Sequence, residues 1–186
     1  VTPQYALDAL RIKAESLVSI GRVEEATAIY ESIATTKAVP WARMGYAMML
    51  KRQNRLGEAR DEASRLNEEY PDFLSVYDLM AKMHEDAGEL QQAIGFLERA
   101  STITASSNTD RLRKIADVAE AAGDRPKAIS TLKRVVERTR RSTILKVDDY
   151  LNLTRSLLEE DLLDEAAKLA EEMRVDTKNL DTGELA

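Results

Sequence analysis

The sequence predicts an all-α fold in which about five helix-turn-helix repeats, ten helices in all, stack into an α-α superhelix or solenoid. Two observations predict it. A turn residue is followed five positions later by an alanine, and this frame occurs five times: Gly21 and Ala26, Asn54 and Ala59, Gly88 and Ala93, Gly123 and Ala128, and Asp161 and Ala166. The alanines are 33, 34, 35 and 38 residues apart, a period typical of stacked helical pairs.

The helices follow from apolar spacing and from the turn residues between them. Turn positions hold Gly, Asn or Asp because these residues tolerate a positive φ at a helix end. Pro126 suits the first turn of a helix, and Pro40 and Pro71 mark junctions between repeats. We expect helices near 4–20, 23–36, 40–52, 56–69, 73–87, 90–104, 109–121, 125–139, 146–160 and 162–174.

Small residues are expected where the two helices of a repeat cross. Ala47, Ala81 and Ala116 each lie twelve residues before a frame alanine. A small residue therefore faces a small residue at each of these crossings, and the two helices can pack closely.

The repeats divide most of the chain. We expect an array over 1–174, with repeats near 7–39, 40–73, 74–108, 109–146 and 147–174. Residues 175–186 contain Gly183, several polar residues and no apolar periodicity, so this tail is predicted to be disordered.

Composition narrows the function classes. The net charge of −6 makes nucleic acid an unlikely partner, because nucleic-acid binders usually carry a basic excess. The chain contains no cysteine, which suits a reducing compartment. The cytoplasm, a reducing compartment, is therefore the expected location. The chain has no apolar run near the roughly 20 residues that span a bilayer, so we expect no membrane partner. Because the chain starts at Val1, we expect a domain excised from a longer protein.

The frame resembles the tetratricopeptide repeat (TPR), which places glycine in the turn, alanine early in the second helix and often proline at the end. The second repeat matches through Ala47, Leu50, Leu56, Ala59, Leu66 and Pro71, and the third through Tyr77, Ala81, Gly88, Ala93, Leu97 and Ala100. The fifth departs most, with Thr154 and Asp161. The resemblance covers about 170 residues.

A narrower resemblance rests on the order of several short sequence segments. The runs 40–47 and 77–81, Arg111-Leu112 ahead of 122–124, and 149–151 are similar to bacterial response regulators that join such repeats to a receiver domain. This resemblance implies a missing N-terminal phosphoacceptor domain and a role in two-component signalling.

The residues offer little for catalysis. The single histidine, His84, stands where the repeat usually has a large packing residue, and one histidine cannot form a multi-histidine metal site. The seven glycines are isolated and form no nucleotide-binding loop. We therefore expect no enzyme, no catalytic residue, no metal and no cofactor.

The resemblance implies that first helices line a concave groove, at positions 2, 5, 9 and 12 of each repeat. The implied lining comprises Arg11, Glu15, Trp41, Met44, Met48, Lys51, Ser75, Asp78, Lys82, Glu85, Asp110, Arg113, Asp117, Glu120, Leu151 and Arg155. The candidate partner-binding residues among them are Trp41, Met44, Met48, Lys51, Asp78, Lys82, Arg113, Asp117 and Arg155.

Trp41, Met44 and Met48 share one helix face, and flexible methionines beside a tryptophan suit an adaptable peptide anchor. The alternative is that all three pack between repeats. Lys51, Lys82, Arg113 and Arg155 could hold carboxylates of a bound peptide.

Two further surfaces have alternative interpretations. The basic stretch Lys133, Arg134, Arg138, Arg140, Arg141 and Lys146 is either solvated or a contact for phosphate or an acidic partner. In the last helix, Leu163, Ala167 and Ala170 are expected to pack inward. Leu162, Leu169 and Met173 then form a second apolar stripe, which would pack on the tail, on a second copy or on a flanking segment.

Three functions fit the sequence. The first is a non-enzymatic scaffold that binds a peptide or helix of a protein partner in its groove, as part of a bacterial signalling protein. The second is a structural module that forms a homodimer through its terminal helix. The third is a sensor of a small ligand or nucleic acid.

Overall fold

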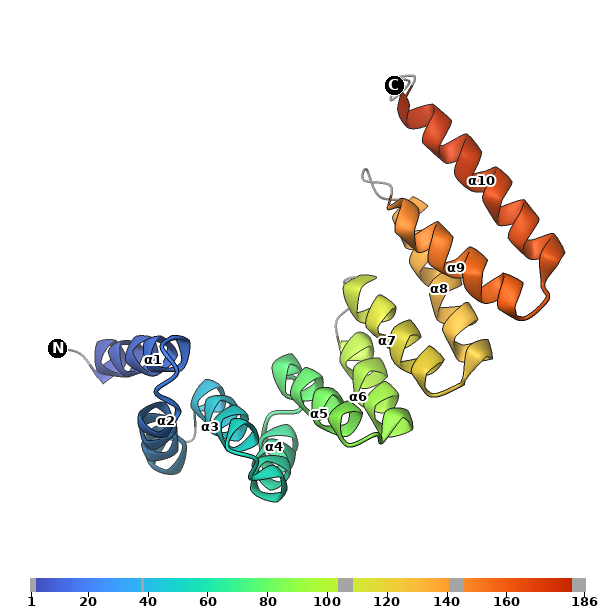
Figure 1. The fold of residues 1–186 in the computed structure, drawn as a ribbon. Coiled ribbons are helices and arrows are strands. Elements are labelled where there is room, and N and C mark those ends of the chain that lie inside the picture. The colour runs from blue at the N-terminus through green and yellow to red at the C-terminus, as the bar shows by residue number, and fades with distance from the viewer. Residues whose placement is uncertain (1–2, 38, 104–108, 141–145, 182–186) are drawn as a thin grey trace. The chain divides into compact units, whose positions relative to one another are not determined.

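The computed structural model describes residues 3–37, 39–103, 109–140 and 146–181, and Figure 1 shows their helices. Within these ranges the chain forms ten α-helices and no strand, which confirms the all-α prediction. The helices are α1 (Pro3–Ser19), α2 (Val23–Lys37), α3 (Pro40–Arg52), α4 (Leu56–Glu69), α5 (Leu74–Asp86), α6 (Leu90–Ile103), α7 (Thr109–Ala121), α8 (Arg125–Arg140), α9 (Val147–Glu159) and α10 (Leu163–Asp181).

Every helix end lies within one residue of its prediction except the last. α10 continues to Asp181, so the predicted end at 174 is wrong, and the segment 175–181 is helical where disorder was expected. The side chain of Asp176 explains the extension, because its carboxylate accepts hydrogen bonds from Tyr150 and Arg140. Residues 182–186 of the predicted tail lie outside the described residues.

The turn of each repeat has one repeated hydrogen-bond pattern, which gives the frame its physical meaning. The five turn residues all have positive φ, between 56° and 78°, as predicted. The next residue donates its N–H to the carbonyl five residues back, as Arg22 does to Leu17 (2.9 Å) and Leu162 does to Leu157 (2.9 Å). This is the bond of a Schellman cap. The frame alanine then donates the first backbone hydrogen bond of the second helix in all five repeats.

Close packing of small residues holds each helical pair together. Ala47, Ala81 and Ala116 are at most 3% exposed. The frame alanines of their repeats, Ala59, Ala93 and Ala128, are at most 1% exposed, in agreement with the predicted crossings. Ala14 occupies the same position in the first repeat and is also fully buried.

The chain divides into two units, 1–83 and 84–186. The first unit has a core built around Ala14, Leu17, Ala26, Tyr30 and Ile33 on α1 and α2, with Ala42 and Met49 from α3. The second has a core in which Ile129, Leu132 and Val136 of α8 meet Tyr150, Leu153 and Leu157 of α9 and Ala166 and Leu169 of α10.

A buried carboxylate joins three helices of the second unit. Asp149 on α9 is 2% exposed. Its oxygens accept hydrogen bonds from the Nε (2.6 Å) and Nη2 (2.7 Å) atoms of Arg113 on α7, and from the hydroxyl of Thr139 on α8 (2.6 Å). The buried charge is thus paired and hydrogen-bonded, as burial of a carboxylate requires.

This arrangement predicts an acid-dependent loss of stability. Burial by itself raises the pKa of Asp149, but the hydrogen bonds from Arg113 and Thr139 outweigh burial and hold the pKa below its usual value. A carboxyl whose pKa is lower when folded stabilises the fold above its unfolded pKa, about 3.9. That contribution is lost as the pH falls through the folded pKa.

We therefore expect the wild type to exceed Asp149→Asn in unfolding free energy by a constant amount above about pH 5, and by less below about pH 4. Urea denaturation across this pH range measures the difference. A difference that does not change with pH would contradict the assignment.

The last helix packs with the face opposite to the predicted one. Leu169 is 7% exposed, and Met173 packs against the same core. Leu163 is 61% exposed, and Ala167 and Ala170 are also exposed. The predicted stripe of Leu162, Leu169 and Met173 is therefore wrong as an exposed surface, since only Leu162, at 38%, remains exposed.

The reason is that the frame alanine sets the inward face. Ala166 is 3% exposed. Leu169 and Met173 follow it by three and seven residues, so they lie on its face of the helix. Both candidate stripes had helical spacing, and only their register against Ala166 distinguishes them.

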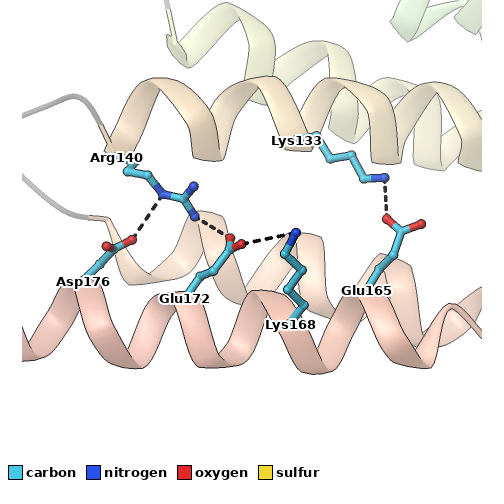
Figure 2. Close-up of polar contacts among 6 residues, drawn as sticks. All are labelled: Lys133, Arg140, Glu165, Lys168, Glu172 and Asp176. Carbon is cyan, nitrogen blue, oxygen red and sulfur yellow. Dashed lines mark hydrogen bonds and ion pairs between the residues drawn. The ribbon is translucent and has the colours of Figure 1, made fainter.

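Ion pairs also join α10 to α8 (Figure 2). Lys133 contacts Glu165 (2.6 Å), and Arg140 contacts Glu172 (2.5 Å) and Asp176 (3.3 Å). Residues of these ion pairs also line a cavity of about 340 Å³, whose apolar lining residues are Val136, Leu153, Leu157 and Leu169. Lys133 and Arg140, two members of the predicted basic stretch, thus hold α10 in place.

Candidate functional site

A groove in the first unit gathers several of the predicted lining residues. It has a volume of about 470 Å³ and lies between α1, α2 and α3. Arg11, Glu15, Trp41, Met44, Met48 and Ser75, all expected on the concave face, line it together with Val18, Ser19, Tyr30, Gly45, Met49 and Phe73. We call this cavity the Trp41 groove.

Helical geometry places the three apolar side chains on one face of α3. Trp41, Met44 and Met48 are spaced three and four residues apart, so they lie one above another. Met48 is 39% exposed, whereas Trp41 and Met44 are half-buried. Flexible thioethers that are partly open to solvent can adapt to the shape of a ligand.

Aromatic and charged neighbours fix the tryptophan. The ring of Tyr30 meets that of Trp41 edge to face, with centroids 6.3 Å apart at 71°. The guanidinium of Arg11 lies over the Trp41 ring, 5.5 Å from its centroid, and pairs with Glu15 (2.8 Å). Both are recognised stabilising geometries. The groove therefore has an ordered wall beside the adaptable methionines.

Gly45 allows α3 to approach Tyr30. A Cβ atom at this position would overlap the Tyr30 ring, and Tyr30 is only 6% exposed. A larger residue must displace that ring and with it the wall of the groove.

We expect Gly45→Ala to destabilise the fold by about 1–2 kcal/mol, because overpacking outweighs the gain in helix propensity. Gly57→Ala is the matched control: nothing lies within 4 Å of its added Cβ. It is expected to stabilise the helix by up to about 1 kcal/mol. Thermal denaturation compares the two, and equal shifts would contradict the Tyr30 contact.

The remaining candidates lie elsewhere. Lys51 is half-buried on α3, and Asp78 and Lys82 are exposed on α5. None of the three lines the Trp41 groove. In the second unit Arg155 is exposed on α9.

Arg113 and Asp117 both lie on α7. The guanidinium of Arg113 is bound to Asp149 and to Asp110 (2.5 Å), so its hydrogen-bonding capacity serves the fold. Desolvation raises the pKa of Asp117; Lys114 opposes the rise and nearby Glu120 adds to it.

The sequence prediction missed six lining residues: Val18, Ser19, Tyr30, Gly45, Met49 and Phe73. Two of the six, Tyr30 and Phe73, are aromatic. Tyr30 comes from the second helix of its repeat, whereas the expected lining was drawn from first helices. Phe73 precedes α5 at a repeat junction. An aromatic residue beside a predicted junction was the available signal for Phe73; the contact of Tyr30 with Gly45 had no local signal.

The single histidine, His84, is engaged in contacts within the fold. The ring of His84 stacks on Phe96, with centroids 5.1 Å apart at 19°, and its Nδ1 contacts Glu89. Across the described residues, no group of three His, Asp or Glu side chains could hold a metal ion. Over the same part of the chain, no helix is both long and apolar enough to cross a bilayer.

Solved structures of helical repeat proteins match nearly the full chain. A crystal structure of MamA gives a TM-score of 0.71 at 15% identity, over 96% of each chain. A kinesin-light-chain-like protein of Podosopora anserina with nearly identical TPR-like repeats gives 0.70 at 18% identity, over 97% of this chain and 99% of that one. MamA from Desulfovibrio magneticus RS-1, from residue 41 to its end, gives 0.66 at 13% identity, over 94% and 96%.

These likenesses confirm a fold of TPR-like helical repeats. The identities are low, and the agreement therefore concerns the fold. No protein-family model and no curated protein sequence matches the chain.

Proposed function

We propose that this chain is a non-enzymatic protein-interaction scaffold that binds a peptide or helix of a partner protein in the Trp41 groove. The observation that carries the proposal is a groove of about 470 Å³ lined by Trp41, Met44 and Met48. Binding sites for such anchors are concave and mostly apolar, with a few polar groups for orientation. Arg11 and Glu15 supply those polar groups here.

The dimensions suit one or two anchor side chains of a bound segment. A tryptophan with two flexible methionines provides contact area at which a buried apolar anchor contributes most of the binding energy. The Arg11–Glu15 pair is about half exposed on both sides, so either charge can turn to a polar group beside the anchor.

The scaffold is proposed to serve a bacterial signalling protein. The support is the resemblance of the runs 40–47, 77–81 and 149–151 to response regulators with appended repeats. Sequencing the coding region before Val1 tests this role. A receiver domain with a phosphoacceptor aspartate there is the expected result, and an unrelated domain would contradict it.

Comparative affinity capture from the source cell tests the groove. Wild type is compared with a Trp41→Ala, Met44→Ala double variant and with Leu56→Ala, a control whose exposed leucine (47%) lies outside the groove. We expect a partner that the wild type and the control retain and the double variant loses. Equal recovery by all three proteins would reject the groove as the binding site.

Circular dichroism of each variant separates loss of binding from loss of the fold. Trp41 and Met44 are only half-buried, so a folded double variant is expected. If it does not fold, the single variant Met48→Glu serves instead, because Met48 is 39% exposed and a charge there blocks an apolar anchor.

A further inference from the structure

The exposed apolar side chains are concentrated in the first and last helical pairs. Of the thirteen large hydrophobic residues that are exposed in the described part of the chain, ten belong to these two pairs. Only Met48, Leu56 and Ile103 come from the three pairs between them. The end repeats of such an array normally carry polar outer faces, so these two apolar ends need an explanation.

Contacts in the second unit show which positions of a first helix face the next repeat. Glu85, eight residues before its frame alanine, pairs with Lys114 on the following first helix (2.8 Å). Glu120, at the same position one repeat later, accepts a hydrogen bond from Ser156. Arg113, fifteen residues before its frame alanine, binds Asp149. Side chains at these two positions thus contact the first helix of the next repeat.

On α9 the same two positions hold exposed leucines. Leu158 lies eight residues before Ala166 and is 50% exposed, and Leu151 lies fifteen residues before it and is 47% exposed. On α7 these two positions, Arg113 and Glu120, contact α9 through polar groups. On α9 the same positions are apolar. We call Leu151 and Leu158 the back face.

On α1 the complementary positions are also apolar and exposed. Ile12, fourteen residues before Ala26, corresponds to Lys114 and is 64% exposed. Leu10 is 38% exposed, although the corresponding residues of the other four repeats are at most 7% exposed: Arg43, Tyr77, Leu112 and Tyr150. We call Leu10 and Ile12 the front face.

We propose that a second copy of this chain docks its front face on the back face of the first, continuing the repeat stack head to tail. The internal contact between Glu85 and Lys114 would be replaced at this junction by Leu158 and Ile12, so two apolar side chains meet where an ion pair stands inside the array. Such a contact is heterologous, because different surfaces meet, and it can add further copies at both ends.

The test is sedimentation velocity over a concentration series with wild type, Leu158→Glu and Ile12→Lys. The wild type is expected to grow beyond a dimer as its concentration rises. Each single variant should weaken association about tenfold or more, because a charge is buried without a partner. An equimolar mixture of the variants should associate again, since the unaltered front of one meets the unaltered back of the other.

Leu56→Glu is the matched control, because Leu56 is as exposed as Leu151 but lies in an inner repeat. It should associate like the wild type. Thermal unfolding of all variants is expected to be unchanged, because the substituted side chains are exposed. A wild type that stays monomeric, a single variant that associates normally, a mixture that stays apart, or a control that loses association would each overturn the proposal.

Discussion

Replacing Asp149 by alanine is expected to lower the unfolding free energy by about 3 kcal/mol, because it removes one partner of a buried, hydrogen-bonded ion pair. The carboxylate is 2% exposed and receives three hydrogen bonds from Arg113 and Thr139. Its removal leaves the hydroxyl of Thr139, itself 4% exposed, without that acceptor. Denaturant titration measures the shift of the midpoint at constant slope.

Asp110→Ala is the matched control for this prediction. Asp110 pairs with the same arginine, Arg113, at 2.5 Å, but its side chain is 85% exposed. An exposed ion pair contributes between about 0 and 1 kcal/mol, so the control should lose little stability. Equal losses in the two variants would show that burial of Asp149 is not the source of its effect.

Arg43→Met is expected to cost a similar amount, about 3 kcal/mol, in the first unit. The guanidinium is 8% exposed and donates to Glu62 (2.6 Å) and Glu69 (2.5 Å), and Glu62 is itself 11% exposed. The substitution leaves the Glu62 carboxylate buried without its main partner. The double variant Arg43→Met, Glu62→Leu should recover most of the loss, since an apolar pair avoids the cost of desolvating two charges.

Arg55→Met provides the comparison within the same unit. The side chains of Arg55 and Glu58 are 44% and 57% exposed, and solvent screens such a pair, so its loss should change stability much less than Arg43→Met does. If Arg43→Met were as mild as this control, the buried network would not stabilise the α3–α4 pair.

Local signals in the sequence predict most of the fold. The helix ends are predicted by the turn residues, because each turn requires a positive φ at one residue. These residues are Gly21, Asn54, Gly88, Gly123 and Asp161. All five have a positive φ. The alanine crossings follow equally directly, because close approach requires small side chains at fixed spacing.

Long-range partners had no such local signal. Asp149 lies 36 residues from Arg113, and nothing in either neighbourhood predicts the pair. The extension of α10 depends in the same way on Tyr150 and Arg140, which bind Asp176 from other helices. The inward face of α10 was predicted wrongly because two apolar stripes on this helix have helical spacing. The stripe on the same face as the frame alanine, Ala166, is the buried one.

The candidate site was predictable in part for the same reason. Trp41, Met44 and Met48 share a helix face by spacing alone, and they line one groove. Asp78 and Lys82 are exposed on α5 and do not line that groove. The aromatic wall of the groove depends on Tyr30 meeting Gly45, a contact between repeats that only the packed structure shows.

Fluorescence of Trp41 gives the most direct test of the Trp41 groove as the binding site. The chain contains one tryptophan, and it lines the groove, so its emission reports on occupancy without a label. Titration with the captured partner should shift the emission saturably, with the dissociation constant found by calorimetry. Binding seen by calorimetry with unchanged Trp41 emission would place the partner elsewhere and contradict the proposed function.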